Sequence, residues 1–177
     1  TLIHARGCTA AKLVRVARAE GIEVVLVQSD PDMESPAADM LGPKDRLVCI
    51  GGNTPDESYL NGLSVVRVAE LEKVDSLHPG IGFLSENANF SRICGENDIK
   101  FIGASPEMID AMGDKASAKA TMKAAGVPTI PGSEGILADF EEAKACAHDI
   151  GYPIMLKATA GGGGKGMQVC KDDEELA

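Results

Sequence analysis

The chain has 177 residues, a net charge of −10, 44% hydrophobic residues and only 3% aromatic residues. This length allows one domain, or one domain and part of a second, and the composition predicts an aliphatic core. The negative charge argues against nucleic acid or an anionic membrane as a partner, and no apolar run approaches the roughly 18 residues that a transmembrane helix needs. We therefore expect an acidic protein of the cytoplasm, or of the mitochondrial matrix if the source is eukaryotic.

The first hundred residues alternate short apolar runs with amphipathic segments, a pattern typical of successive β–α units. The expected strands are residues 2–5, 23–27, 47–50, 74–77 and 100–102. The expected helices are residues 10–20, one that begins at Thr54, and one from Ser85 to about Gly95. At the second, Thr54 and Glu57 form a capping box and Pro55 fits the first helical position. Short connections between the strands predict an open, parallel, Rossmann-like sheet.

From Ser105 onward, two helices are expected back to back, at residues 106–112 and 115–125. Asp139 with Glu142 then predicts the start of a helix that runs to Ile150. We expect three parts: a Rossmann-like domain over residues 1–104, a helical linker over 105–131 and the beginning of a lid subdomain over 132–177.

A run of four glycines, Gly161 to Gly164, lies between the apolar segments 152–156 and 167–170. Each glycine costs about 0.5–1 kcal/mol relative to alanine, so such a run is useful where backbone N–H groups must approach a ligand. Lys157 and Lys165 flank the run and indicate that the ligand is anionic. The pattern predicts a hairpin lid over a nucleotide.

Two other glycine motifs fit this run less well. A Walker loop would need a glycine at position 159 and Ser or Thr at 166, where the chain has Thr159 and Gly166. A dinucleotide motif would need a helix after the glycines, where the chain has a strand-like run. A flexible surface hairpin without a ligand remains an alternative.

The segment from His78 to Asn87 follows an expected strand, at the sheet edge where open α/β proteins bind ligands. Gly80 and Gly82 would let a ligand contact the backbone, and a helix beginning at Ser85 would favour an anion by about 0.3–1 kcal/mol. The alternative is a plain turn beside a packed histidine.

Lys115 is expected at a helix start, where the helix dipole opposes a cation unless an anion is bound nearby. A solvated surface lysine is the alternative for this position.

Several segments together resemble the biotin carboxylase component of biotin-dependent carboxylases. They are Met112-Gly-Asp-Lys115, Ala125-Gly-Val-Pro128, Pro131-Gly132, Gly151-Tyr-Pro153, the glycine run, and His78-Pro-Gly-Ile-Gly-Phe-Leu-Ser-Glu-Asn87. The glycine run alone is similar to ATP-grasp enzymes in general, and the segment from His78 narrows the resemblance. It implies an α/β fold with a Rossmann-like pre-ATP-grasp domain, a helical linker and an incomplete ATP-grasp lid subdomain.

In that family, ATP activates bicarbonate as carboxyphosphate, and CO₂ then passes to biotin carried on a carrier domain. The resemblance implies that ATP contacts Lys115, Lys157, Gly163, Gly164 and Met167. It places biotin near Gly80 and Gly82. The expected partners are the remaining biotin carboxylase segment, the biotin carboxyl carrier domain and a carboxyltransferase in an oligomer, without nucleic acid or membrane.

The family's Mg²⁺ ligands, bicarbonate-binding arginine and general base would all follow Ala177. We therefore expect no catalytic residue and no metal ligand within this chain, and no activity from the 177 residues alone. The ends, Thr1 and Ala177, lead us to expect a piece of a longer protein, although a separately encoded subunit would have the same ends.

Two segments depart from the family pattern. Residues 4–10 read His-Ala-Arg-Gly-Cys-Thr-Ala where Ala-Asn-Arg-Gly-Glu-Ile-Ala is usual, and Ile81 stands where tyrosine is usual. The changes at Ala5, Cys8 and Ile81 support one alternative, a noncatalytic assembly module of a carboxylase complex. The glycine run leaves a second alternative, another ATP-grasp ligase such as a carbamoyl phosphate synthetase or a purine-pathway carboxylase, which would share the run but not the segment from His78.

Overall fold

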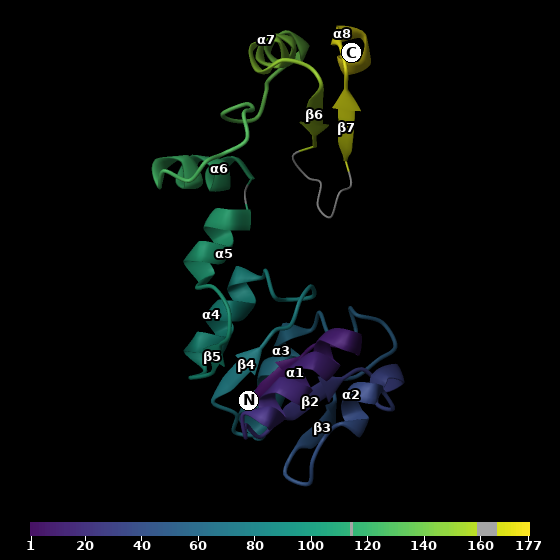
Figure 1. Cartoon of the computed structure of the whole chain (residues 1–177). Coiled ribbons are helices and arrows are strands. Elements are labelled where there is room, and N and C mark those ends of the chain that lie inside the picture. Colours follow the sequence, from purple (N-terminus) through teal and green to yellow (C-terminus); the bar gives the residue numbers. More distant parts are fainter. Residues whose placement is uncertain (114, 159–165) are drawn as a thin grey trace. The chain divides into compact units, whose positions relative to one another are not determined.

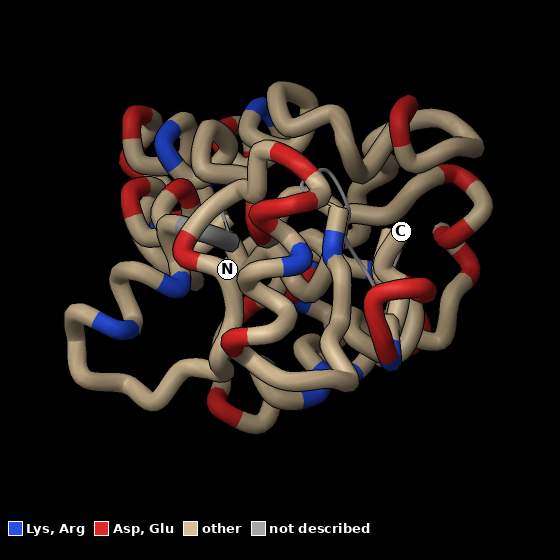
Figure 2. Tube along the Cα trace, turned by 90° about the horizontal axis from the view of Figure 1, so that it is seen from above, with Lys and Arg blue, Asp and Glu red and all other residues tan. Residues whose placement is uncertain are grey.

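The computed structural model describes residues 1–113, 115–158 and 166–177 (Figure 1). The chain divides into two compact units, Thr1–Asp110 and Ala111–Ala177. Among the described residues, no helix is both long and apolar enough to cross a membrane. Acidic residues lie on segments all along the chain, with lysine and arginine interspersed (Figure 2).

The first unit contains a five-stranded parallel sheet in the order β3-β2-β1-β4-β5. Its strands are β1 (Leu2–His4), β2 (Val25–Gln28), β3 (Arg46–Cys49), β4 (Ser76–His78) and β5 (Lys100–Phe101). All five expected strands are confirmed, and their ends lie within two residues of the expected ones, the usual uncertainty of such boundaries. The order reverses between β1 and β4.

Helices cover both faces of this sheet because successive side chains of a strand point to opposite faces. Leu2 of β1 packs with residues of α3 (Gly62–Leu71) and α4 (Ala88–Glu96). Its neighbour Ile3 packs with residues of α1 (Gly7–Ala19) and α2 (Pro36–Asp39). The first unit is therefore doubly wound, as the expected Rossmann-like sheet requires. A short 3₁₀ helix, η1 (Asp30–Asp32), follows β2.

The expected helix start at Thr54 is wrong, because residues 55–60 form turns. The Glu57 carboxylate does reach back to the Thr54 N–H, at 3.1 Å, but the chain turns again, with the Leu60 N–H bonded to the Pro55 carbonyl at 2.7 Å. Helix α3 begins only at Gly62, where the Asn61 side chain accepts from the Ser64 N–H.

The expected helix start at Ser85 is also wrong. Ser85 lies in a turn, and its N–H bonds to the Gly82 carbonyl at 2.9 Å. Helix α4 begins at Ala88, where the Asn87 side chain accepts from the Phe90 N–H at 2.8 Å. This cap already satisfies one of the free amide groups to which an anion was expected to bind.

The second unit holds the end of α5 (Pro106–Gly113), then α6 (Lys115–Ala124), α7 (Phe140–Ile150), a hairpin and α8 (Asp173–Leu176). The cap of α7 is confirmed, since the Asp139 side chain accepts from the Glu142 N–H. Glu142 reaches back to the N–H of Ala138, one residue before the cap. The hairpin joins β6 (Ile154–Lys157) to the antiparallel β7 (Met167–Cys170), as the sequence predicts.

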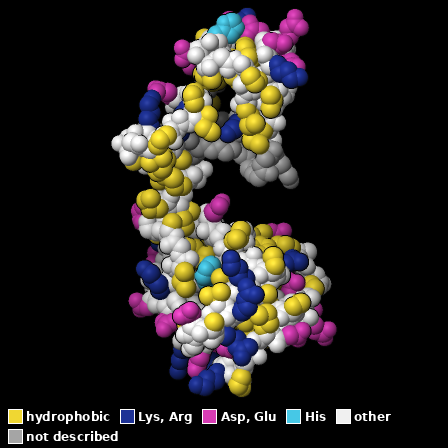
Figure 3. Space-filling model, viewed as in Figure 1, with side chains coloured by type: hydrophobic (Ala, Val, Ile, Leu, Met, Phe, Trp, Pro, Cys, Tyr) yellow, Lys and Arg dark blue, Asp and Glu magenta, His cyan; other side chains and the backbone are white. Residues whose placement is uncertain are grey.

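Only part of the hairpin is buried. Cys170, Ala147 and Leu176 form a small core with Tyr152 and Ile154. On the other side, Met155, Met167 and Val169 are about half exposed, and apolar side chains reach the surface over both strands (Figure 3). A two-stranded sheet by itself is only marginally stable in water, so the hairpin depends on its contacts with the small core.

One polar side chain lies fully inside the first unit. His4 ends β1, has an exposed fraction of 0% and lies among the rings of Tyr59, Phe83 and Phe90. Its Nε2 is 2.9 Å from the Tyr59 carbonyl oxygen, which can only accept, so Nε2 carries the proton. Its Nδ1 has no partner among the described residues. Burial lowers the pKa of His4 to about 4, because a second proton would have no acceptor.

This burial predicts a loss of stability in acid. An unfolded histidine has a pKa near 6.5, so between about pH 6.5 and 4 the unfolded chain binds a proton that the folded chain excludes. Above about pH 6.5 the excluded proton costs no stability. As the pH falls toward 4, the free energy of unfolding decreases by up to about 3 kcal/mol. Urea unfolding at several pH values measures this slope. His4→Gln, which has no titrating ring, should flatten it, and an unchanged slope would contradict this origin.

Candidate functional site

The carboxyl ends of β1 and β4 meet where the strand order reverses, which is the place where open α/β sheets bind ligands. Ala5 and Arg6 follow β1 there, and Pro79 and Gly80 follow β4. The Gly80 N–H donates to His78 Nδ1 at 3.1 Å, which fixes the first bend of the chain after β4. Partial burial lowers the pKa of His78 and favours the neutral ring that this bond needs.

Gly80 lies too close to β1 to carry a side chain. Its φ is +67°, and an added Cβ would lie 2.7 Å from the Ala5 Cβ and 3.1 Å from the His4 carbonyl oxygen. Gly82 has a similar φ of +78°, but no atom lies within 4 Å of the place of its Cβ. Between them, Ile81 is 81% exposed. The turn therefore presents backbone and one apolar side chain at the sheet edge.

The next residue of the turn, Phe83, is not glycine but has a φ of +43°. Its ring stacks on the Tyr59 ring, with centroids 4.6 Å apart and planes 13° apart. The Tyr59 hydroxyl donates to Asp32 Oδ2 at 2.8 Å and accepts from the Ser29 N–H at 3.1 Å. Burial raises the pKa of Tyr59 to about 12, so the hydroxyl remains a donor at all physiological pH values.

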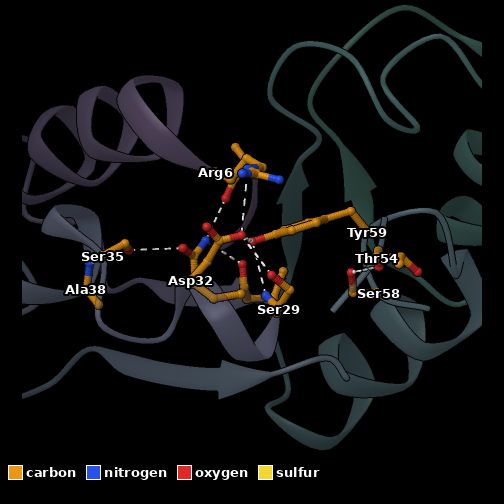
Figure 4. Close-up of polar contacts among 11 residues, drawn as sticks. Arg6, Ser29, Asp32, Ser35, Ala38, Thr54, Ser58 and Tyr59 are labelled. Atoms are coloured by element: carbon orange, nitrogen blue, oxygen red, sulfur yellow. Dashed lines mark hydrogen bonds and ion pairs between the residues drawn. The ribbon is translucent and has the colours of Figure 1, made fainter. Parts of the chain in front are cut away.

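Asp32 connects three segments of the site (Figure 4). Besides Tyr59, its Oδ2 accepts from Ser29 Oγ at 2.7 Å and lies 3.6 Å from Arg6 Nε. A separate hydrogen bond also joins the ends of β1 and β2, because Gln28 Nε2 donates to the Ala5 carbonyl at 2.7 Å. Sequence reasoning missed this network, since Arg6, Asp32 and Tyr59 are far apart in the chain and no sequence pattern links them.

In the second unit, the hairpin brings two of the predicted ATP-binding residues together. Lys157 ends β6, Met167 begins β7, and the two are direct cross-strand partners. The Ala158 N–H donates to the Gly166 carbonyl at 2.8 Å and extends the pairing toward the glycines. Gly163 and Gly164 lie outside the described residues. Lys115 is the first residue of α6, and its side chain also lies outside the described part.

The Lys157 side chain is exposed, and no ion pair to it occurs within the described ranges. Other lysines of this unit are paired, for example Lys123 with Glu134 and Lys144 with Asp173. Lys157 therefore presents a positive charge at the point where the hairpin enters the glycine run. An ammonium group beside a glycine-rich segment of the sequence is a combination that binds phosphate groups in proteins.

A second carboxylate, Asp173, ties the base of the hairpin to α7. It accepts from the Tyr152 hydroxyl at 2.8 Å and lies 3.0 Å from Lys144 Nζ and 2.7 Å from His148 Nε2. The Tyr152 hydroxyl, the Lys144 ammonium and the His148 ring keep the pKa of Asp173 far below its usual range. These contacts hold the chain before β6 and the start of α8 against α7, beside the small core of this unit.

The two glycines of the turn should differ in their tolerance of a methyl group. Gly82→Ala suffers only the left-handed backbone, about 1–2 kcal/mol of unfolding free energy. Gly80→Ala adds the overlap with Ala5 and should lose at least about 1 kcal/mol more. Thermal unfolding of the two variants measures the difference. Equal losses would contradict the close approach of β1 and β4.

Comparison with known proteins places the chain in a family. The family description "Biotin carboxylase, N-terminal domain" matches residues 1–109, and "Carbamoyl-phosphate synthase L chain, ATP binding domain" matches residues 114–177. Biotin carboxylase 1 of Bacillus subtilis is 47% identical over 99% of this chain. The mitochondrial propionyl-CoA carboxylase alpha chain of Homo sapiens is 43% identical over 98% of it.

Solved structures agree with this placement. A biotin carboxylase–β-γ-ATP complex from Campylobacter jejuni superposes with a TM-score of 0.90 at 44% identity, over 99% of this chain and 39% of that one. The biotin carboxylase domain dimer of the Hydrogenobacter thermophilus 2-oxoglutarate carboxylase, in complex with MgADP, ADP and bicarbonate, gives 0.87 at 44% identity, over 99% and 38%. The chain spans 38% of the length of the Bacillus subtilis relative. With its parallel sheet, its glycine turn and a family match across residues 1–109, the chain belongs to the biotin carboxylase family.

Proposed function

We propose that this chain forms the N-terminal part of a biotin carboxylase, which carboxylates carrier-bound biotin with bicarbonate and ATP through carboxyphosphate. Two observations support this proposal: the family match over residues 1–109, and the turn with Gly80 and Gly82 after β4 within that range. We assign a Rossmann-like domain to residues 1–104, a helical linker to 105–131 and the beginning of the ATP-grasp lid to 132–177.

The lid part of the chain would bind the phosphates of ATP. Lys157 is supported by its exposed, unpaired position among the described residues beside the glycine run, and Met167 lies directly across the hairpin. We assign Gly163 and Gly164 as amide donors, Lys115 as a second phosphate contact and Met167 as a neighbour of the adenine. A lysine and fixed amides neutralise and orient phosphate, which is the main contribution a protein makes to phosphoryl transfer.

The sheet edge of the first unit would receive biotin. Gly80 and Gly82 give the turn an exposed backbone, and Ile81 between them offers an apolar side chain to the ring system of biotin. This side chain differs from the tyrosine usual in the family, so its contact with biotin is aliphatic and not a ring stack.

The remaining parts of the reaction would come from outside this chain. The described ranges contain no group of three His, Cys, Asp or Glu side chains that could hold a metal ion. We assign the Mg²⁺ ligands and the catalytic residues to the remaining carboxylase segment. The other proposed partners are a biotin carboxyl carrier domain and a carboxyltransferase, in an oligomer of the cytoplasm or the mitochondrial matrix. Related proteins include a carboxylase small subunit and a biotin carboxylase domain dimer.

Removal of the Lys157 charge should weaken nucleotide binding in the complete carboxylase. A charged hydrogen bond contributes about 1.5–3 kcal/mol, so Lys157→Ala should raise the KM for Mg-ATP by about 10- to 150-fold. Lys171→Ala is the matched control, because Lys171 is an exposed lysine of the same unit that pairs with Glu175. Equal effects of the two substitutions would contradict a specific phosphate contact.

Thermal protection separates the proposed enzyme from a noncatalytic assembly module. A nucleotide at about 100 times its Kd adds about 2.7 kcal/mol to the stability of the protein that binds it. The complete carboxylase should therefore unfold at a higher temperature with Mg-ATP, and Lys157→Ala should reduce this shift. No shift at saturating Mg-ATP would favour the assembly module.

A further inference from the structure

We propose that Tyr59 is a positioning residue that holds the turn from Gly80 to Phe83 in the shape that receives biotin. This inference rests on the proposed biotin carboxylase function. Tyr59 is 1% exposed and lies in the turn segment before α3, in a part of the chain that carries none of the predicted site residues.

The turn has few hydrogen bonds of its own to keep its shape. Within it, the Gly80 N–H donates to His78 and the Ser85 N–H donates to the Gly82 carbonyl. The amides of Ile81 and Gly82 have no acceptor among the described residues. Three residues of the turn are left-handed, and in Phe83 this conformation is unfavourable because the residue is not glycine. A contact from outside the turn must therefore compensate for it.

Tyr59 provides that contact. Its ring is nearly parallel to the Phe83 ring at 4.6 Å, whereas the His4 and Phe83 ring centroids are 6.0 Å apart. If Phe83 returned to an ordinary φ, its ring would leave this stack. The observed shape of the turn and the position of Tyr59 are therefore coupled.

Tyr59 itself is fixed by both of its ends. Its hydroxyl bonds to Asp32 and to the Ser29 N–H, and its carbonyl accepts from His4 Nε2. Asp32 also lies beside Arg6, so segments that follow β1 and β2 converge on Tyr59 (Figure 4). Tyr59 thus links β1 and the segment after β2 to the turn after β4, and its fixed position restrains the Phe83 ring.

A turn that is already held in its bound shape loses less conformational entropy when a ligand binds. A ligand that uses the amides of Ile81 or Gly82 gains affinity if these amides already have their bound geometry. Loss of the stack should weaken biotin binding and leave the nucleotide site unaffected.

The test compares Tyr59→Leu with Phe101→Leu in the complete carboxylase. Phe101 is buried in the same core cluster and meets Phe90 edge to face, but it makes no ring contact with the turn. Tyr59→Leu should raise the KM for free biotin by about tenfold, which corresponds to about 1.4 kcal/mol, and should leave the KM for Mg-ATP unchanged. Phe101→Leu should leave both KM values unchanged.

Amide hydrogen exchange tests the same coupling without catalysis. Exchange at residues 81–84 should accelerate in Tyr59→Leu and not in Phe101→Leu. If the leucine variant does not fold, Tyr59→Phe replaces it. This variant retains the ring and loses the bonds to Asp32 and Ser29, so biotin KM should rise about threefold.

Unchanged biotin KM and unchanged exchange in the Tyr59 variants would overturn the inference, as would equal effects in Phe101→Leu. Failure of the parent enzyme to carboxylate biotin would overturn the proposed function and the biotin role of the turn. The exchange measurement would then still decide whether Tyr59 holds the turn.

Discussion

The close contact between the ends of β1 and β4 determines the shape of the ligand edge of the first unit. Gly80 comes so near to Ala5 and the His4 carbonyl that no side chain fits there. Glycine at position 80 lets the chain that leaves β4 pass this close to the end of β1. The resulting surface exposes backbone beside the side chain of Ile81, which suits a ligand that is recognised partly through amides.

A polar network behind this surface keeps it in place. Tyr59 and His4 are polar side chains in the core, and Asp32 lies partly buried beside them. A buried polar group is costly without a hydrogen bond, and the Tyr59 hydroxyl and His4 Nε2 each have a partner. The hydrogen bonds of these three residues join the Tyr59 segment to β1 and to the segment after β2, and the stack of Tyr59 on Phe83 joins the turn after β4 to them. The His4 Nδ1 has no partner among the described residues, and it makes the network sensitive to acid.

Much of the fold could be predicted from the sequence, because short apolar runs with helical segments between them specify a doubly wound sheet. The failed helix starts at Thr54 and Ser85 share a feature. Tyr59, which follows Thr54, and Phe83, which precedes Ser85, stack on each other, and both lie in the turns that stand where the helix starts were expected. This contact between residues 24 positions apart leaves no local pattern.

The candidate sites were predictable to different degrees. Glycines near an expected strand end identified Gly80 and Gly82, and their left-handed backbone gives a physical reason for glycine at both. Asp32 and Tyr59 gave no such signal, since an acidic residue after a strand and a tyrosine before a helix are common. Their roles follow only from three-dimensional contacts.

A crystal structure of the complete carboxylase with biotin and a Mg-ATP analogue tests the central claim most directly. The account predicts that biotin lies against the backbone of Gly80 to Gly82 while Phe83 remains stacked on Tyr59, and that the nucleotide phosphates contact Lys157. Biotin bound elsewhere, with the turn free of ligand, would contradict it.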